Sequence, residues 1–287
     1  MTSVRVWEPS DTARMLRAPG KDDNKYSRGV VGIATGSERY PGAAVLGVEG
    51  AMRTGIGMVR FLGSETPTRL VLQRRPEVVL GGGRVEAWVV GSGLPPADER
   101  SQQDMSHMAT ALVSGAPLVV DAGALDRLGA AAGPAVITPH HRELERTLAM
   151  TSTPLTLEQI TADAAAAASA AADALGVTVL LKGFTTHVAS PGGGEPIAIA
   201  LGTPWLATAG AGDVLSGMLG ALIAGHADEV SARGEQALAE LAATAAALHG
   251  LAGVRASGGG PITALDVARA VPGVIAALLQ TRPDAEG

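Results

Sequence analysis

The amino-acid sequence predicts an α/β protein with a central, mostly parallel β-sheet and helices on both of its faces. Short runs of almost continuous apolar residues recur along the chain, at 29–35, 87–90, 117–120, 135–138 and 177–181. Longer segments that are rich in alanine and other helix formers separate these runs. Strands that are apolar on both faces and alternate with helices are typical of parallel sheets covered on both sides.

The segments between the apolar runs have the composition of closely packed helices. Residues 42–58 are mostly small and apolar, which suits a helix that lies close against a sheet. Residues 161–175 contain the run AAAAASAAA, and because alanine is the best helix former we predict a helix at the solvent edge rather than a linker. Two further helices are expected at 213–224 and 234–255. Residues 186–189 are expected to pair antiparallel with the strand before them.

Length and composition restrict the class of protein. Of the 287 residues, 46% are hydrophobic, which is enough for a buried core and excludes wholesale disorder. The net charge of −6 and the aromatic content of 2% argue against a broad nucleic-acid-binding surface. Because the chain has no cysteine, it has no disulfide, no thiolate nucleophile and no cysteine-bound zinc.

No stretch of the sequence is predicted to span a membrane. The longest apolar tract, residues 214–225, contains Ser216 and three glycines and is shorter than the roughly 20 residues that a spanning helix needs. The first residues carry charges and lack the apolar core of a signal peptide. We therefore expect a cytoplasmic protein. We also expect one domain over residues 1–287, with about 20 residues at the start and about 10 at the end peripheral.

Polar or glycine-rich residues follow each predicted strand at the point where the strand ends. These residues are Asp121 and the segments 36–37, 91–93, 138–140 and 182–183. Ligands of open α/β sheets bind beyond the carboxyl ends of the strands. The sequence therefore predicts a binding site at this edge of the sheet.

The segment TAGAGDVLSG, residues 208–217, leads from small residues directly into an apolar helix. Gly210 and Gly212 allow the backbone to approach a ligand closely, and the first N–H groups of a helix attract anions. Asp213 lies near the helix start, where it is placed to take a proton from a hydroxyl group while the amides hold a phosphate. Its type and position also suit a helix N-cap, so both interpretations stay open.

Two well-known phosphate-binding motifs are missing from the sequence. It has no GxxxxGK[ST] loop, and the segment Gly55-Ile56-Gly57 lacks the third glycine of a dinucleotide-binding fingerprint. A P-loop or a Rossmann-type nucleotide site is therefore disfavoured, and any nucleotide must be held in another way.

The other polar residues at strand ends each have two interpretations. Lys182 can reach a phosphate or extend along the sheet edge to solvent, and Asp121 can bind a hydroxyl group or cap the next helix. Thr185 and Thr186 can donate to a phosphate or serve as ordinary strand residues. The segment that contains His140 and Glu143 has poor spacing for a metal site and better suits a loop cap. We assign no role to the histidines at 107, 187, 226 and 249.

In combination and in this order, several segments resemble the ADP-dependent NAD(P)H-hydrate dehydratases of the ribokinase-like superfamily. The resemblance covers roughly residues 20–255, which is most of the chain. Its segments are NKYSRGVVGIATGSERYPGAA (24–44), VVGSGL (89–94), VVDAGAL (119–125), VITPHHRELERTL (136–148), LLKGFTTHVAS (180–190) and LATAGAGDVLSGMLGALIAG (206–225).

The resemblance implies a ribokinase-like fold and an enzyme that repairs the S epimer of hydrated NADH or NADPH. The added hydroxyl group would be phosphorylated by ADP, with Mg²⁺, and loss of phosphate would restore the double bond. Asp213 would be the catalytic base. The resemblance implies a nucleotide site at Lys182, Gly183, Phe184, Thr185, Thr186 and Gly212. It implies an anion hole at Gly210, Ala211 and Gly212, and substrate contacts at Ala43, Ala44, Gly93, His140 and Asp213. It gives no metal ligands.

The sequence departs from the family pattern at several positions. The usual TPHPGE is TPHHRE at 138–143, and the usual GTGD is GAGD at 210–213, which removes a hydroxyl group at Ala211. The resemblance further implies a homo-oligomer, of which the family suggests a tetramer. The epimerase domain often fused to this family has no room in 287 residues, so such a partner is expected to be a separate chain.

Two alternatives remain open from the sequence. One keeps the fold and makes the chain an ATP-dependent kinase of a small vitamin-precursor alcohol, in which Asp213 has the same part. The other is a nucleotide-binding protein without catalytic activity. Turnover of a hydrated dinucleotide without accumulation of a phosphorylated alcohol distinguishes the first prediction from both.

Overall fold

The computed structural model describes residues 2–282, in which ten strands form one sheet. The order across the sheet is β1-β10-β9-β8-β7-β6-β5-β2-β3-β4. The strands are β1 (Arg5–Val6), β2 (Val30–Ala34), β3 (Met58–Phe61), β4 (Val79–Leu80), β5 (Ala87–Val90), β6 (Leu118–Val120), β7 (Ala135–Ile137), β8 (Thr178–Leu181), β9 (Thr186–Ala189) and β10 (Ile197–Ile199). All neighbouring strands are parallel except at β9, which is antiparallel to both β8 and β10.

Helices connect most of the strands. The α-helices are α1 (Pro9–Met15), α2 (Gly42–Arg53), α3 (Glu65–Arg74), α4 (Gln102–Leu112), α5 (His141–Leu148), α6 (Leu157–Ala162), α7 (Ala164–Leu175), α8 (Ala211–Gly225), α9 (Ala227–Arg233), α10 (Glu235–Ser257) and α11 (Ala264–Gln280). Short 3₁₀ segments are η1 (Ala97–Glu99), η2 (Ala122–Ala130) and η3 (Pro204–Leu206).

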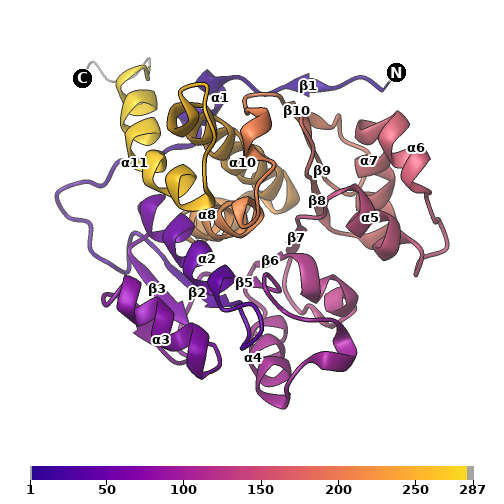
Figure 1. Cartoon of the computed structure of the whole chain (residues 1–287). Coiled ribbons are helices and arrows are strands. Elements are labelled where there is room, and N and C mark those ends of the chain that lie inside the picture. The colour runs from indigo at the N-terminus through magenta and orange to yellow at the C-terminus, as the bar shows by residue number, and fades with distance from the viewer. Residues whose placement is uncertain (1, 283–287) are drawn as a thin grey trace.

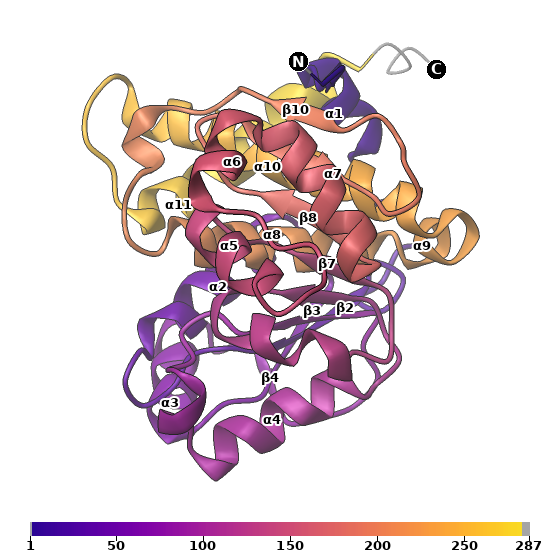
Figure 2. The ribbon, with the colours of Figure 1, turned by 90° about the vertical axis from the view of Figure 1, so that its right-hand side faces the viewer.

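The central strands bury both of their faces. Alternate residues of one strand belong to two different hydrophobic clusters: Val119 of β6 lies in the first, and its neighbours Leu118 and Val120 lie in the second. Helices α1, α2, α8, α10 and α11 form the first cluster with the sheet, and α4, α5, α6 and α7 form the second. The two groups lie on opposite sides of the strands (Figure 1; Figure 2 shows the same layers from the side). The prediction of a mostly parallel sheet with helices on both faces is confirmed.

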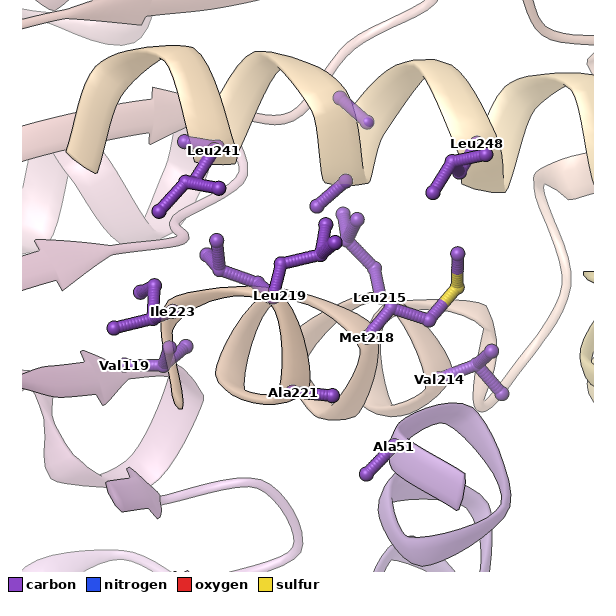
Figure 3. Packing of buried hydrophobic residues seen from close by; sticks show 14 of the residues in the cluster. Ala51, Val119, Val214, Leu215, Met218, Leu219, Ala221, Ile223, Leu241 and Leu248 are labelled. Atoms are coloured by element: carbon purple, nitrogen blue, oxygen red, sulfur yellow. The ribbon is translucent and has the colours of Figure 1, made fainter. Parts of the chain in front are cut away.

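Helix α8 lies at the centre of the first cluster and is buried on all sides from Val214 to Ala224. Its leucines face the leucines of α10, while its other side lies near Ala51 of α2 (Figure 3). Glycines bring α8 and α2 into backbone contact, because a methyl group at Gly217 would overlap the carbonyl oxygen of Gly47. The start of α8 is therefore held in a fixed place relative to the sheet.

The predicted strands and long helices are present with small changes in their ends. The helix predicted at 42–58 ends at Arg53, because the chain turns at Thr54 and Gly55 and continues into β3. The alanine-rich segment is helical, and its alanines at 165, 167, 168, 171 and 172 are buried, so that helix packs on the sheet and is not only a solvent edge. The single-domain expectation stays a prediction.

One helix among residues 2–282, α10, is long and apolar enough to cross a membrane by length and composition alone. Within its most apolar stretch of 18 residues, 83% is buried inside the fold. This apolar character is accounted for by packing against α8 and α11, since α10 forms part of the first hydrophobic cluster.

Candidate active site

The carboxyl ends of β5, β6, β7 and β8 meet at one edge of the sheet, as the sequence predicts. Asp121, which follows β6, accepts four hydrogen bonds there from the side chains of surrounding residues. Its Oδ1 accepts from Thr138 Oγ1 at 2.8 Å and from Lys182 Nζ at 3.0 Å. Its Oδ2 accepts from Ser92 Oγ at 2.8 Å and from Ser216 Oγ, on α8, at 2.9 Å.

Asp121 is an ionised carboxylate in spite of its complete burial. Burial alone would raise its pKa, but the positive charge of Lys182 and the hydrogen bonds outweigh that effect and lower the pKa. Asp121 precedes η2 as its N-cap, yet its side chain makes no capping hydrogen bond. Of the two sequence interpretations of this residue, helix capping is therefore wrong.

Lys182 points into the site rather than along the sheet edge. Its Nζ lies 3.0 Å from Asp121 Oδ1 and 3.9 Å from Glu143 Oε2. Burial tends to lower the pKa of this ammonium group, and the two carboxylates reverse the effect and raise it. The same Nζ lies 3.5 Å from the position that a Cβ at Gly212 would occupy, so the cation lies directly beside the start of α8.

The start of α8 supplies hydrogen-bond donors next to this cation. Gly210 adopts a left-handed conformation with φ of 87°, and a Cβ there would overlap Leu46 of α2. Among the described residues, the N–H groups of Gly212 and Asp213 have no acceptor. A helix of this length concentrates partial positive charge at such a terminus. Free amides and an adjacent ammonium group together form a place for an anion.

Asp213, on the first turn of α8, has the protonation behaviour of a base that works near neutral pH. Burial and the negative charge of Asp121 raise its pKa to about 6, although Lys182 acts in the opposite direction. A carboxylate with this pKa is mostly ionised at pH 7 and accepts a proton more readily than an ordinary aspartate. The N-cap of α8 is Gly210 and Asp213 is the third residue of the helix, so the N-cap interpretation of Asp213 is wrong.

A cavity of about 780 Å³ brings most of the sequence-predicted site residues together. Its polar end holds Asp121, Lys182 and the start of α8, while Ile199, Leu201, Leu206 and Leu215 give it an apolar wall. The predicted residues that line it are His140, Lys182, Gly183, Phe184, Thr186, Gly210, Ala211, Gly212 and Asp213. A size of this order and a mixed lining suit a nucleotide.

Four predicted residues lie outside the lining of this cavity: Ala43, Ala44, Gly93 and Thr185. The first three lie where the loops after β2 and β5 meet the start of α2: Gly93 packs against Ala43, and the completely buried Ala44 packs against Gly36. Gly93 has φ of 70°, and a Cβ there would overlap that of Ala43. These residues shape the loops beside the cavity.

His140 and Glu143 form a reciprocal cap at the start of α5. The backbone N–H of His140 donates to Glu143 Oε2 at 2.8 Å, and Nδ1 of His140 accepts from the backbone N–H of Glu143 at 3.2 Å. The loop-cap interpretation of this segment therefore describes its geometry. Both side chains also line the cavity, and the exposed ring of His140 remains available at its rim.

The family model described as NAD(P)H-hydrate dehydratase matches residues 31–268, which include every element that builds this cavity. The chain belongs to the NAD(P)H-hydrate dehydratase family. Among the relatives it resembles is a bifunctional NAD(P)H-hydrate repair enzyme of Mycobacterium tuberculosis, 41% identical over 236 residues, or 78% of this chain and 46% of that protein. This chain thus spans about half the length of the first curated relatives that it matches.

Shorter relatives in the dehydratase family match over most of their own length. An ADP-dependent (S)-NAD(P)H-hydrate dehydratase of Neisseria meningitidis is 33% identical over 73% of this chain and 74% of that protein. The crystal structure of the ADP/ATP-dependent NAD(P)H-hydrate dehydratase of Bacillus subtilis, co-crystallised with ATP and Mg²⁺, superposes with a TM-score of 0.80. It is 25% identical, and the match covers 96% of this chain and 99% of that one. The resemblance seen in the sequence is confirmed.

The structure adds residues that sequence reasoning did not place in the candidate site. Ser92 and Ser216 bind Asp121, and His249 of α10 lines the cavity. Burial lowers the pKa of His249 to about 4, so its ring is neutral at pH 7. The only sequence signal for Ser92 and Asp121 was their place after a strand, and Ser216 and His249 gave none because they lie inside apolar helices.

Proposed function

We propose that the chain dehydrates the S epimer of hydrated NADH and NADPH and uses ADP, which leaves AMP and phosphate. The observation that carries this proposal is the anion site at the start of α8, which has Lys182 on one side and Asp213 within its first turn. Family membership and the printed activities of the Neisseria and Bacillus relatives support the choice of substrate and nucleotide.

In the proposed reaction Asp213 removes the proton from the hydroxyl group of the hydrate. The hydroxyl oxygen bonds to the β-phosphorus of ADP, and the bond between that phosphorus and the bridging oxygen breaks to release AMP. The proposed anion hole of residues 210–212 and the ammonium group of Lys182 stabilise the charge of the phosphoryl group in transfer. Within it the N–H of Ala211 donates to Thr208 O at 3.4 Å, whereas the N–H of Gly212 has no acceptor among the described residues and is left free for the phosphate. The carbon–oxygen bond of the new phosphate ester then breaks and phosphate leaves with the bonding electron pair. Loss of a proton from the adjacent ring carbon restores the double bond.

The proposed nucleotide site is the segment from Lys182 to Thr186 together with Gly212. Lys182, Gly183, Phe184 and Thr186 line the cavity, and the ring of Phe184 is 73% exposed and able to lie against a flat ring. For the hydrated dinucleotide we propose contacts at His140, Asp213 and the loops that contain Ala43, Ala44 and Gly93. These loops border the same edge of the sheet through Ser37, whose Oγ donates to Gly93 O at 2.8 Å.

The described side chains do not form a cage for Mg²⁺. No group of three or more His, Asp or Glu side chains within residues 2–282 has the arrangement of a metal site. The lone pairs of Asp121 are already occupied by four donors. Mg²⁺ commonly binds through substrate phosphates and water with few protein ligands. We therefore propose that Mg²⁺ enters with ADP, and no step above depends on it.

The proposal extends to the oligomeric state, the pathway partner, the location and the number of domains of the enzyme. Family resemblance favours a homo-oligomer, and an NAD(P)HX epimerase is the expected pathway partner because the dehydratase accepts one epimer. Relatives such as the Mycobacterium protein are named bifunctional. A cytoplasmic location and a single domain complete the proposal.

The test is an absorbance assay of reduced nicotinamide with NADHX, Mg²⁺ and either ADP or ATP. Recovery of the absorbance with ADP supports the proposal, and recovery with ATP alone keeps the reaction but overturns the choice of nucleotide. A folded protein that binds nucleotide without any recovery would overturn the reaction. Accumulation of a phosphorylated vitamin-precursor alcohol would then favour the kinase alternative.

A further inference from the structure

Asp121 lies beneath the anion site and contacts both of the elements that form it. We infer that Asp121 is a positioning residue, which fixes Lys182 and the first turn of α8 relative to each other so that phosphate and base are correctly placed. This inference rests on the proposed function. It concerns a residue that the proposed chemistry does not itself use.

The first contact runs through Lys182. Its flexible side chain ends in a point charge that could adopt many positions in a cavity of this size. Oδ1 of Asp121 holds Nζ at 3.0 Å and leaves it next to Gly212, within reach of a phosphate on the amides of α8. Glu143 is more distant at 3.9 Å, so Asp121 determines the place of the cation.

The second contact runs through Ser216 of α8. Its Oγ donates to Asp121 Oδ2 at 2.9 Å and lies 3.0 Å from the carbonyl oxygen of Gly212. The hydroxyl group therefore connects Asp121 to the peptide unit whose neighbouring N–H groups face the cavity. Both oxygens of the same carboxylate thus lead to Gly212, one through a cation and the other through a hydroxyl group.

Asp121 has no capacity left for another role. A carboxylate offers about four lone-pair sites, and Ser92, Thr138, Lys182 and Ser216 each supply a donor. It therefore has no free site for a metal ion, and its low pKa makes it a poor base. Because its four donors come from two strand ends, a loop and a helix, its function is to hold these elements in register.

The backbone beside Asp121 supports a positioning role. Ala122 has φ of 42°, and within residues 2–282 it is the only residue other than glycine with a positive φ. Such a conformation is costly and persists only where the surroundings enforce it, most often at functional sites. A Cβ at Gly91 would overlap the carbonyl oxygen of Asp121, so the preceding loop is also fitted closely to this residue.

The experiment compares two single substitutions that each remove one hydrogen bond to Asp121. Ser216→Ala removes the contact that leads to Gly212, and Thr138→Val removes a contact that leads only to the sheet. Both are expected to lower the Tm by a similar amount, about 2–4 °C. We expect kcat to fall about tenfold in Ser216→Ala and much less in Thr138→Val. Equal losses of kcat in the two variants would overturn the inference.

Asp121→Asn supplies a readout that a merely structural role would not change. Without the charge of Asp121, the pKa of Asp213 should fall toward its ordinary value, because one negative neighbour is removed while Lys182, which Glu143 also faces at 3.9 Å, still acts on Asp213. The acidic limb of the pH profile of kcat/KM should therefore move to lower pH, together with a loss of kcat. A folded variant whose acidic limb of kcat/KM lies at the same pH as in the natural chain, and whose kcat is near normal, would contradict the inference.

The same variants separate this inference from the proposed function. If the unmodified protein fails to convert NADHX with either nucleotide, the proposed reaction is wrong. Calorimetric binding of ADP and an NMR titration of the Asp213 carboxyl group then test Asp121 without any turnover. Unchanged ADP binding in Ser216→Ala and an unchanged Asp213 titration in Asp121→Asn would overturn the positioning role by themselves.

Discussion

Two carboxylates of this protein, the buried Glu49 and the cavity-lining Asp213, have opposite protonation behaviour. Glu49 of α2 is completely buried, yet three guanidinium groups bind it: Arg53 and Arg74 through Nε at 2.7 and 2.6 Å, and Arg75 through Nη2 at 2.8 Å. Burial would raise its pKa, and the three arginines instead lower it to about 2. Asp213 has one nearby cation, Lys182, which it shares with Asp121 and Glu143, and its pKa is raised to about 6.

The difference shows that burial alone does not set the charge of a carboxylate in this fold. Where cations outnumber the carboxylate, as around Glu49, the group is permanently ionised and has a structural role. Where several carboxylates share one ammonium group, as Asp121, Glu143 and Asp213 share Lys182, one of them, Asp213, accepts protons near neutral pH. Substitutions at the two places should therefore affect different properties of the protein.

The largest effect is expected on turnover in Asp213→Asn. This change removes the proposed base but keeps the size of the side chain, so kcat should fall by about 10²–10⁴ while ADP binding stays nearly unchanged. Steady-state kinetics and calorimetry measure the two quantities. A variant with full activity would show that the proton goes elsewhere.

Substitution of Glu49 should instead reduce stability. Glu49→Gln leaves Arg53 and Arg74 without their counter-ion and leaves Arg75 with Glu77 alone, and we expect a loss of about 2–4 kcal/mol in the free energy of unfolding at pH 7. Arg84→Ala is the control, because its ion pair with Glu86 is largely exposed at Arg84 and should contribute only about 0–0.5 kcal/mol. Denaturant unfolding measures both, and similar losses would refute the special role of the Glu49 cluster.

The pH dependence of this loss follows from the pKa of Glu49. The native state holds the proton less tightly than the unfolded chain, so the contribution of Glu49 is complete above its ordinary pKa of 4.5 and declines as the pH falls toward 2. The difference between the natural chain and Glu49→Gln should shrink over that interval.

A smaller effect of opposite sign is expected for the stability of Asp213→Asn. The native state binds the proton of Asp213 more tightly than the unfolded chain, so this group lowers stability as the pH rises from about 4 to about 6. Above pH 7 the variant should be more stable than the natural chain by about 1–3 kcal/mol, and below pH 4 the two should be equal. Unfolding at pH 4 and pH 8 is the measurement, and a pH-independent difference would contradict the assigned pKa.

The smallest effect concerns the nucleotide. Lys182→Ala removes one charge-assisted contact to a phosphate, so the KM for ADP should rise about tenfold, with a smaller loss of kcat. Thermal unfolding of the same variant must first show that Asp121 without its cation leaves the protein folded. A larger change in kcat than in KM would place Lys182 in the chemical step.

The sequence predicts the central part of this fold well because apolar runs such as 87–90 are buried on both faces. It does not predict the two-residue edge strands β1 and β4, whose residues are exposed and become strands only through their neighbours. Strand β3 also escapes prediction, since Arg60 interrupts its apolar pattern and the helix before it is equally apolar.

In the site, too, residues that are adjacent in sequence are predictable, and contacts between residues far apart in sequence are not. Gly210, Gly212 and Asp213 are recognisable because the loop and the helix start are adjacent in sequence. The pairing of Asp121 with Lys182 joins residues that are 61 positions apart, and Ser216 is 95 positions from Asp121. Only the folded sheet places them together, so sequence alone leaves their roles open.

The glycine contacts between α2 and α8 set how accurately the chemistry can be placed. Helix α8 has Asp213 and the anion site at its first turn, and Gly217 and Gly50 let its backbone rest directly on that of α2. Backbone atoms cannot change rotamer, so this interface has little freedom to slide. A single added methyl group at Gly217 would displace the whole first turn and misalign the base with the phosphate, without altering any residue of the cavity itself.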